Sequence, residues 1–190
     1  MKKIIKDNFE KIKLITVGRL TEAKNPELIL DIIQLLKEKY NNFEFIWVGD
    51  GELRGYIEQQ AVSRQINILV TGWKDKNQLN EILKNSDIYL QGSKWEALPL
   101  SLLEAMSFSL PVVVSDIPAH SDIIEKGITG FLASDPEEFV NHIIWLIQDP
   151  QLRVEIGENA RNEVINHYSS DQFNKKLYEY YVGVVKLTLA

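Results

Sequence analysis

Short apolar runs alternate with amphipathic segments along most of the chain, and this alternation predicts β-strands separated by α-helices. The apolar runs are Ile12–Val17, Phe43–Val48, Ile66–Thr71, Asp87–Gln91, Pro111–Ser115 and Thr129–Ala133. Most are apolar at successive positions rather than at every second one, which is typical of parallel strands covered on both faces. The pattern therefore predicts an α/β fold in three layers, with a parallel sheet of about six strands and helices at the C-terminal end.

Several amphipathic segments carry signals for a helix start. Asn25 is a candidate cap with Pro26 at the first helical position, and Asp75 with Gln78 has the spacing of a capping box. The other predicted helices are Glu52–Ser63, Pro99–Phe108, Ser121–Lys126, a helix opened by Asp135, Pro136 and Glu138, and two at the end of the chain. The last of these is predicted to be capped by Ser169 and Gln172, with an apolar stripe of Phe173, Leu177, Tyr180 and Val184.

Composition narrows the function classes. The 190 residues contain no internal repeat and no Gly/Ser-rich linker, so we expect one domain over residues 1–190. The 21 basic and 27 acidic side chains give a net charge of −6, which argues against a nucleic-acid partner. The absence of cysteine excludes disulfides, thiolate metal sites and a cysteine nucleophile. Lysines interrupt Met1–Leu14, so we expect no secretory leader and a cytoplasmic location.

Ligands of parallel α/β sheets bind at the carboxyl ends of the strands. This directs attention to four loops, Gly18–Lys24, Gly49–Gly51, Gly72–Asp75 and Gly92–Leu100. The first loop, Gly18–Lys24, carries two cations just beyond a strand. Arg19 offers a planar fork and Lys24 a point charge, a combination that suits a diphosphate without a metal. Taken alone, this loop fits a solvated basic turn better.

The second loop, Gly49–Gly51, begins like a dinucleotide-binding fingerprint. Arg54 occupies the position where that fingerprint needs its third glycine, which argues against a nicotinamide-dependent dehydrogenase. The glycines fit a tight strand-to-helix turn, and they also fit close approach of a ligand to the backbone. A phospho-receiver domain is disfavoured as well, because Gly18 and Arg19 stand where its acidic pair would follow the first strand.

The fourth loop, Gly92–Leu100, brings two carboxylates near a helix start. Glu96 precedes the predicted helix, while Ser101 and Glu104 lie on it, away from its apolar face. A carboxylate there can accept hydrogen bonds from sugar hydroxyls while the helix N-terminus holds a phosphate. A solvated helix acid and a loop acid explain the same residues equally well, so the loop alone leaves both readings open.

The order of the motifs along the chain favours the ligand-binding reading, and Glu96 and Glu104 enclose seven residues. The motifs are Val17-Gly18-Arg19-Leu20, Lys24-Asn25, Val48-Gly49-Asp50-Gly51, Val70-Thr71-Gly72-Trp73, Glu96-Ala97-Leu98-Pro99-Leu100, Leu103-Glu104-Ala105-Met106, Leu110-Pro111-Val112-Val113-Val114-Ser115-Asp116 and Glu125-Lys126-Gly127-Ile128-Thr129-Gly130-Phe131-Leu132. Together they resemble the group-one retaining glycosyltransferases of the GT-B fold. The resemblance covers Ile12 to Val185 and corresponds to the Rossmann-like, nucleotide-sugar-binding C-terminal half of such enzymes.

The resemblance implies roles for the matching positions. Arg19 and Lys24 would neutralise the donor diphosphate and stabilise the leaving group, and Glu96 would sit near the donor sugar; these are the three residues expected to be catalytic. Glu104 would hold the ribose hydroxyls. The residues expected to bind the nucleoside-diphosphate sugar are Gly18, Gly49, Gly72, Trp73, Lys74, Leu98, Leu100, Ser101 and Glu104. The resemblance implies neither a metal nor an organic cofactor besides this substrate.

Two departures from the family pattern stand out. Ala97-Leu98-Pro99 replaces the usual Gly-Phe-Gly after the first glutamate, and Pro99 has no N–H to offer a phosphate. His120 lies in the loop where the family has glycines; it has the reach to contact the donor sugar, but a lone loop histidine is more often a surface residue.

The family's acceptor-binding N-terminal half has no counterpart ahead of Ile12. We therefore expect a partner, either an N-terminal acceptor domain or a separate acceptor subunit, and little transfer by this chain alone. That half would also carry any peripheral membrane association. The alternative hypothesis is a non-catalytic or split-transferase subunit that keeps the fold and docks a separate acceptor-binding partner.

Overall fold

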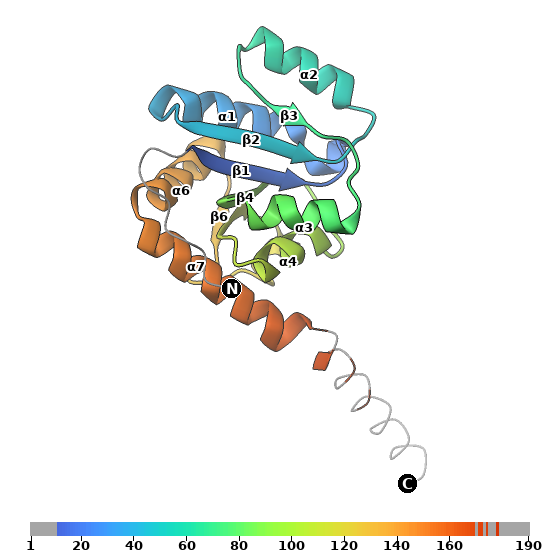
Figure 1. Ribbon diagram of the computed structural model, residues 1–190, viewed down its shortest axis with the longest axis vertical. Helices are drawn as coiled ribbons and strands as arrows, with labels where there is room; N and C mark the ends of the chain where they lie inside the picture. Colours follow the sequence, from blue (N-terminus) through green and yellow to red (C-terminus); the bar gives the residue numbers. More distant parts are fainter. Residues whose placement is uncertain (1–10, 170, 173, 175–177, 179–190) are drawn as a thin grey trace.

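The computed structural model describes residues 11–169, 171, 172, 174 and 178. This part of the chain contains one six-stranded parallel sheet (Figure 1). The strands are β1 (Ile12–Val17), β2 (Phe43–Val48), β3 (Leu69–Val70), β4 (Ile88–Gln91), β5 (Val112–Ser115) and β6 (Phe131–Ala133). Their order in the sheet is β3-β2-β1-β4-β5-β6, and all neighbouring pairs are parallel. The predicted α/β fold with a parallel sheet of about six strands is confirmed.

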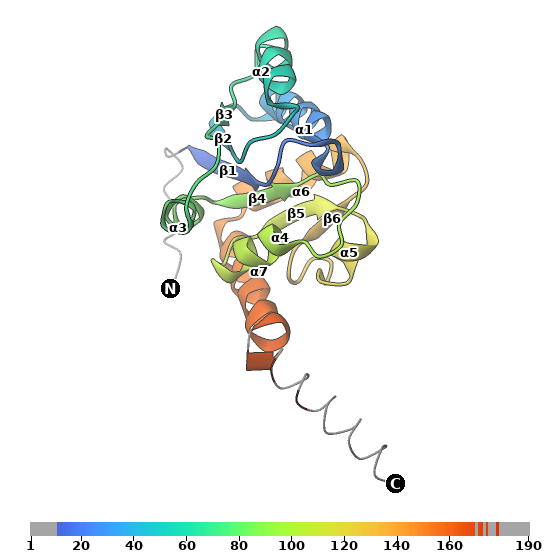
Figure 2. The same ribbon diagram turned by 90° about the vertical axis from the view of Figure 1, so that its right-hand side faces the viewer.

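Helices cover both faces of the sheet (Figure 2). They are α1 (Pro26–Lys39), α2 (Arg54–Ser63), α3 (Lys76–Lys84), α4 (Leu100–Ser107), α5 (Pro118–Ser121), α6 (Pro136–Gln148) and α7 (Pro150–Glu163), with a 3-10 turn η1 (Glu22–Lys24) and a π-helical turn η2 (Val164–Tyr168). Side chains of α1, α2 and α6 pack in one core cluster, and those of α3 and α4 pack in a second cluster on the opposite face. Helix α7 contacts both α4 and α6.

The strands are apolar at successive positions because both faces are buried. Leu14 and Ile15 are adjacent in β1 and wholly buried, yet they belong to the two different core clusters. Successive side chains of a strand point to opposite faces, so such a pair is expected only in a sheet covered on both sides.

Two helix starts form as the local sequence predicts. Asp75 accepts a hydrogen bond from the Gln78 amide at 2.9 Å, and the Gln78 side chain accepts one from the Asp75 amide at 3.2 Å, which completes the capping box of α3. Asp135 caps α6 by accepting from the Glu138 amide at 2.9 Å. Ser169 accepts from the Gln172 amide at 3.4 Å, as a helix cap would. The apolar stripe predicted beyond it (Phe173, Leu177, Tyr180 and Val184) lies outside the described residues.

Two predicted elements were wrong in extent or place. The strand expected over residues 66–71 is only Leu69–Val70, because Gln65 adopts a left-handed φ of 55° and the Ile66 amide closes the end of α2 by donating to Ala61 O at 3.0 Å. The helix expected over residues 121–126 is instead Pro118–Ser121, since Pro118 follows an extended Ile117 and fixes the first helical φ.

Three predicted starts were shifted or had another mechanism. Asn25 does precede α1, but it has a φ of 49° and its side chain accepts no capping bond; its backbone N–H donates to Glu22 O instead. The helix expected from Glu52 begins at Arg54. Pro99 is the residue before α4 rather than its first residue, so the helix begins with Leu100.

The strand order places a topological switch point between β1 and β4. The chain leaves β1 toward one edge of the sheet, whereas the connection from β4 leads toward the other edge. Loops that leave neighbouring strands in opposite directions open a crevice between them at the carboxyl ends. The loops that follow β1 and β4 therefore flank the position where ligands of such folds bind.

Candidate functional site

The two loops at the switch point are joined by their backbones. The Lys94 amide, in the loop after β4, donates to Ala23 O in the loop after β1 at 2.8 Å. The Lys94 ammonium also pairs with the Glu22 carboxylate at 3.0 Å. These contacts hold together two segments that are more than 70 residues apart in the sequence.

Three predicted glycines lie side by side at the carboxyl ends of β1, β2 and β3. The Gly49 amide donates to Gly72 O at 3.0 Å, and Trp47 Nε1 donates to Gly18 O at 2.9 Å. A Cβ atom on Gly49 would stand 2.0 Å from Gly18 O, and the φ of Gly49 is 145°. Only glycine allows this close approach of two backbones, so the predicted second loop packs directly against the backbone of the first.

Lys24 and Glu96 form an ion pair across the crevice. The Lys24 ammonium donates to Glu96 Oε1, and the two side chains keep only 19% and 12% of their exposure. The lysine lies along Gly18, where a Cβ atom would meet Lys24 Cε at 3.1 Å. The structure thus brings together two of the three residues that were expected to be catalytic.

The Glu96 carboxylate is oriented through one of its oxygens. Besides Lys24, Oε1 accepts from Gln91 Nε2 and from Ser93 Oγ, each at 2.7 Å. Oε2 has no hydrogen-bond partner among the described residues. A ligand in the crevice therefore meets a fixed carboxylate with one oxygen available and an ammonium group beside it.

A network of buried polar side chains holds Glu96 in place through Gln91. Tyr89 is wholly buried and donates to Gln91 Oε1 at 2.7 Å, which fixes the amide so that Gln91 Nε2 faces Glu96. The Ser101 hydroxyl lies 3.1 Å from the Tyr89 hydroxyl. Burial raises the pKa of Tyr89 above its ordinary value of 10, and the nearby carboxylates of Glu96 and Glu104 raise it further, so the phenol stays protonated.

His120 belongs to this network, and its expected surface position was wrong. The side chain is wholly buried. His120 Nδ1 lies 2.8 Å from Ser115 O, a carbonyl that can only accept, so Nδ1 carries the proton. Nε2 is then left to accept from Gln91 Nε2, which lies 3.2 Å away. Burial lowers the pKa of His120 below its ordinary value of 6.5, and the ring is neutral at pH 7.

Stability is expected to fall below neutral pH because of His120. Its pKa is lower in the folded chain than in the unfolded chain, so the unfolded chain binds the proton first as the pH drops below about 6.5. The free energy of unfolding should therefore fall as the pH drops through about 6.5 and below, by no more than about 1.4 kcal/mol per pH unit for this group. Urea unfolding of the parent and of His120→Gln at several pH values measures the slope.

His142 is the internal comparison for this experiment, because burial lowers its pKa as well. The His142→Gln variant should therefore also flatten the profile, and carboxylates contribute equally to all three proteins. A profile of His120→Gln as steep as that of the parent would contradict the assignment of a neutral, buried His120.

The other predicted acids and cations make no hydrogen bond or ion pair with Lys24 or Glu96 in the described part of the chain. Glu104, on α4, is near enough to act electrostatically on Tyr89. Arg19 is exposed, and its guanidinium makes no hydrogen bond or ion pair with any described residue. Trp73 is 66% exposed and follows Gly72 at the end of β3, and Lys74 beside it is exposed as well.

The amide groups near the start of α4 fit a phosphate only in part. The amides of Leu98 and Ser101 donate to no described group. The Leu100 amide, which was expected to face the phosphates, instead donates to Leu98 O at 2.9 Å, because the chain turns tightly around Pro99. The Leu98 and Leu100 side chains are 55% and 66% exposed, so this loop presents apolar groups beside the polar pair.

Sequence reasoning missed Gln91 as a site residue. The available signal was its place at the end of β4, where a fully buried polar side chain follows the apolar Ile88–Leu90. A buried amide must find hydrogen-bond partners, and here these are the residues of the site. Arg54, singled out for breaking the dinucleotide fingerprint, pairs with Asp50 and Glu58, each at 3.0 Å.

A sequence profile of one protein family, described as Glycosyl transferases group 1, matches residues 1–163. The chain belongs to this family. Among its relatives is the UDP-Gal:alpha-D-GlcNAc-diphosphoundecaprenol alpha-1,3-galactosyltransferase of Escherichia coli, which is 32% identical over 178 residues, 89% of this chain and 45% of the relative. The chain spans about half the length of the family members it matches.

Two solved structures share the fold of this chain. A variant of S. aureus TarM in complex with fondaparinux, alpha-GlcNAc-glycerol and UDP gives a TM-score of 0.83 at 24% identity, over 89% of this chain and 35% of TarM. The C-terminal domain of a group 1 family protein (LpcC) from Francisella tularensis gives 0.76 at 22% identity, over 85% of this chain and 88% of that domain. The expected resemblance to the C-terminal half of a GT-B glycosyltransferase is confirmed.

Two further findings concern the described part of the chain. No three His, Asp or Glu side chains gather there in a way that could hold a metal ion. None of the described helices combines the length and the apolar character needed to cross a membrane.

Proposed function

We propose that this chain is the donor-binding domain of a retaining glycosyltransferase and that it binds a nucleoside-diphosphate sugar in the crevice between β1 and β4. The observation that carries the proposal is the Lys24–Glu96 pair, which joins the two loops at the switch point and whose lysine lies along the Gly18 backbone. An ammonium group beside glycine backbones suits a diphosphate, and an oriented carboxylate suits sugar hydroxyls. Support also comes from the relatives, because one is named for UDP-Gal and another was solved with UDP.

In this proposal the donor lies along the carboxyl ends of the strands. The base would pack near Gly72, Trp73 and Lys74 at the end of β3. Arg19 and Lys24 would neutralise the diphosphate, with the free amides of Leu98 and Ser101 as further donors. Glu104 would accept from the ribose hydroxyls, and Glu96 would contact the sugar. We propose no metal, because the two cations can neutralise the diphosphate themselves.

The chemistry follows from where charge develops. The bond between the anomeric carbon and the diphosphate oxygen breaks, and its electron pair leaves with the diphosphate. The acceptor hydroxyl oxygen bonds to the anomeric carbon on the same face, and its proton passes to an oxygen of the departing diphosphate. Lys24 and Arg19 would stabilise the negative charge that builds on the leaving group, which lowers the barrier. A second half of similar size, in the same polypeptide or in a separate subunit, would bind the acceptor.

Replacing Arg19 with alanine tests the proposal with little risk to the fold. The Arg19 side chain is exposed and has no hydrogen-bond or ion-pair partner among the described residues, so the free energy of unfolding should change by less than about 0.5 kcal/mol. Calorimetric titration with UDP should show affinity weakened by about tenfold or more, since a charge-assisted contact to phosphate is lost.

Lys84→Ala is the matched control, because it removes a cation at the far end of α3. Its affinity for UDP should equal that of the parent. Equal affinity of Arg19→Ala and the parent, or no binding of UDP by the parent, would count against the proposed function.

A further inference from the structure

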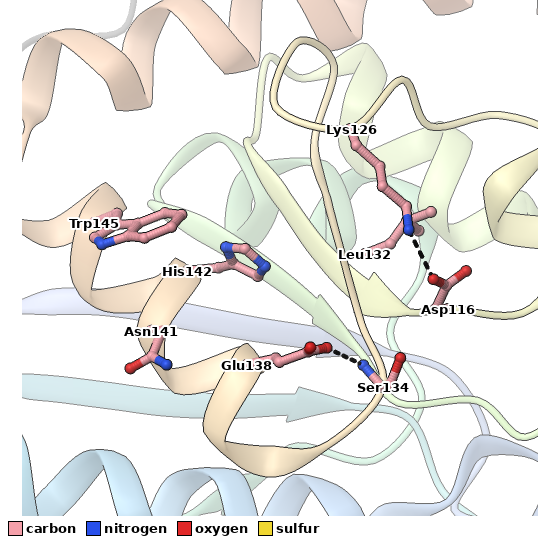
Figure 3. A pocket seen from close by; sticks show the side chains of 8 residues that line it. All are labelled: Asp116, Lys126, Leu132, Ser134, Glu138, Asn141, His142 and Trp145. Atoms are coloured by element: carbon pink, nitrogen blue, oxygen red, sulfur yellow. Dashed lines mark hydrogen bonds and ion pairs between the residues drawn. The ribbon is translucent and has the colours of Figure 1, made fainter.

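A second pocket opens at the edge of the sheet, between β6 and α6 (Figure 3). It encloses about 290 Å³ and is lined by Asp116, Lys126, Leu132, Ser134, Glu138, Asn141, His142 and Trp145. Asp116 directly follows β5 and Ser134 directly follows β6, so the mouth of the pocket is at the carboxyl ends of the strands. It therefore shares the rim of the sheet with the crevice but is separate from it.

One wall of this pocket is an aromatic cluster. His142 stacks on Phe131, with ring centroids 4.6 Å apart, and Trp145 packs edge-on against both rings at 5.2 and 6.3 Å. Trp145 is nevertheless 52% exposed. The indole is thus held by its neighbours while much of its surface faces solvent, an arrangement typical of a binding platform.

Apart from Leu132, the rest of the lining is polar and carries charges of both signs. Lys126 pairs with Asp116 at 2.8 Å, and Glu138 accepts from the Ser134 amide at 2.8 Å. The Asn141 side chain makes no hydrogen bond with a described residue. Two carboxylates against one ammonium group leave the pocket with a formal charge of about −1 at pH 7.

The chemistry of the walls excludes several ligand classes. The excess of carboxylate disfavours a phosphate or another anion. An apolar ligand would strip water from the carboxylates and the amide without replacing their hydrogen bonds. A neutral polyhydroxylated ring meets both demands, because its C–H face can lie on the indole while its hydroxyls bond to carboxylate and amide groups.

We propose that the pocket between β6 and α6 is a second saccharide-binding site, which takes one neutral hexopyranose ring. The source of that ring rests on the proposed function: it would be a sugar of the acceptor or product glycan. The proposed donor runs along the rim from β3 to β4, with its sugar at Glu96. The pocket lies two strand spacings further on, about 10 Å, on the side where the sugar end of the donor points.

The test is a titration of the ¹⁵N-labelled full chain, followed by its amide and indole NMR signals. The probes are methyl α-D-glucopyranoside and methyl N-acetyl-α-D-glucosaminide, and choline serves as a cationic probe for the same aromatic and acidic wall. At least one glycoside should shift the Trp145 indole signal and the neighbouring amides, with a millimolar dissociation constant. Trp145→Ala and Asn141→Ala should each weaken this binding at least about fivefold. Because Asn141 is exposed, the Asn141→Ala substitution should leave the fold intact.

Two controls separate this inference from the proposed function. Trp73→Ala removes another exposed indole from the opposite end of the rim and should leave glycoside binding unchanged. UDP should bind Trp145→Ala as it binds the parent. If UDP binds but neither glycoside shifts the Trp145 signal, the pocket proposal is overturned and the donor proposal stands. If a glycoside shifts the Trp145 signal but UDP does not bind, only the donor proposal is overturned. Binding of choline without either glycoside also overturns the saccharide assignment.

Discussion

Replacement of Lys24 by methionine is expected to weaken UDP binding by about 100-fold or more, which corresponds to about 2.7 kcal/mol. The ammonium is the only cation that contacts Glu96 in the described structure, and it lies along the Gly18 backbone where the diphosphate is proposed to bind. Methionine keeps the length and much of the volume of the lysine, so the loss would report the charge. Calorimetric titration with UDP measures it.

The same substitution should lower the free energy of unfolding by about 2–3 kcal/mol. Removal of one partner of a buried ion pair leaves the other charge without compensation, and such losses reach about 3–5 kcal/mol when burial is complete. Here Glu96 retains 12% exposure and two neutral donors, Gln91 and Ser93, so we expect the lower figure. Urea unfolding gives the value.

A second substitution separates the two effects. Glu96→Gln in the Lys24→Met background removes the uncompensated carboxylate, so the double variant should regain most of the lost stability. It should not regain UDP binding, because the cation is still missing. Recovery of both properties, or UDP affinity retained in Lys24→Met alone, would show that the lysine is structural.

Gly49→Ala is expected to prevent stable folding, with a loss of more than about 4 kcal/mol. The new Cβ would stand 2.0 Å from Gly18 O and 2.8 Å from Gly18 C, and these are backbone atoms of the neighbouring strand end that cannot move aside independently. The φ of 145° adds strain for any residue with a side chain. Circular dichroism and urea unfolding would show whether a cooperative transition remains.

Gly55→Ala is the matched control, because it makes the same chemical change in the same region of the chain. Gly55 lies in α2, and a Cβ atom there meets nothing within 4 Å. Alanine in a helix is favoured over glycine, so this variant should gain up to about 1 kcal/mol. A stable Gly49→Ala protein would mean that the backbones of the two loops are not in close contact.

Strands and caps with local signals could be predicted from the sequence to the residue. β1 and β2 have their expected bounds, and the capping box of Asp75 and the cap of Asp135 formed as their spacing indicates. These features depend on residues within four positions of each other or on a continuous apolar run. β3 and α5 were misplaced because their bounds depend on how the preceding segment ends, at Gln65 and at Pro118.

The place of the candidate site could be predicted from the sequence, but the hydrogen-bond network that supports it could not. A parallel sheet brings the ends of its strands together, so four loops were expected to converge, and Lys24 does meet Glu96. That Gln91 and His120 support this pair depends on a contact between β4 and α5, 29 residues apart, which no local pattern encodes. The ligand roles of these residues stay predictions until UDP binding is measured.

The three donors on Glu96 Oε1 have a thermodynamic consequence for any ligand that reaches this carboxylate. A free glutamate would lose rotational freedom on binding, at a cost of about 0.5–1.5 kcal/mol per immobilised side chain. Here that loss was incurred when the chain folded, since Lys24, Gln91 and Ser93 already restrict the side chain. The recognition surface is pre-organised, and the entropic penalty of engaging Glu96 belongs to folding rather than to association.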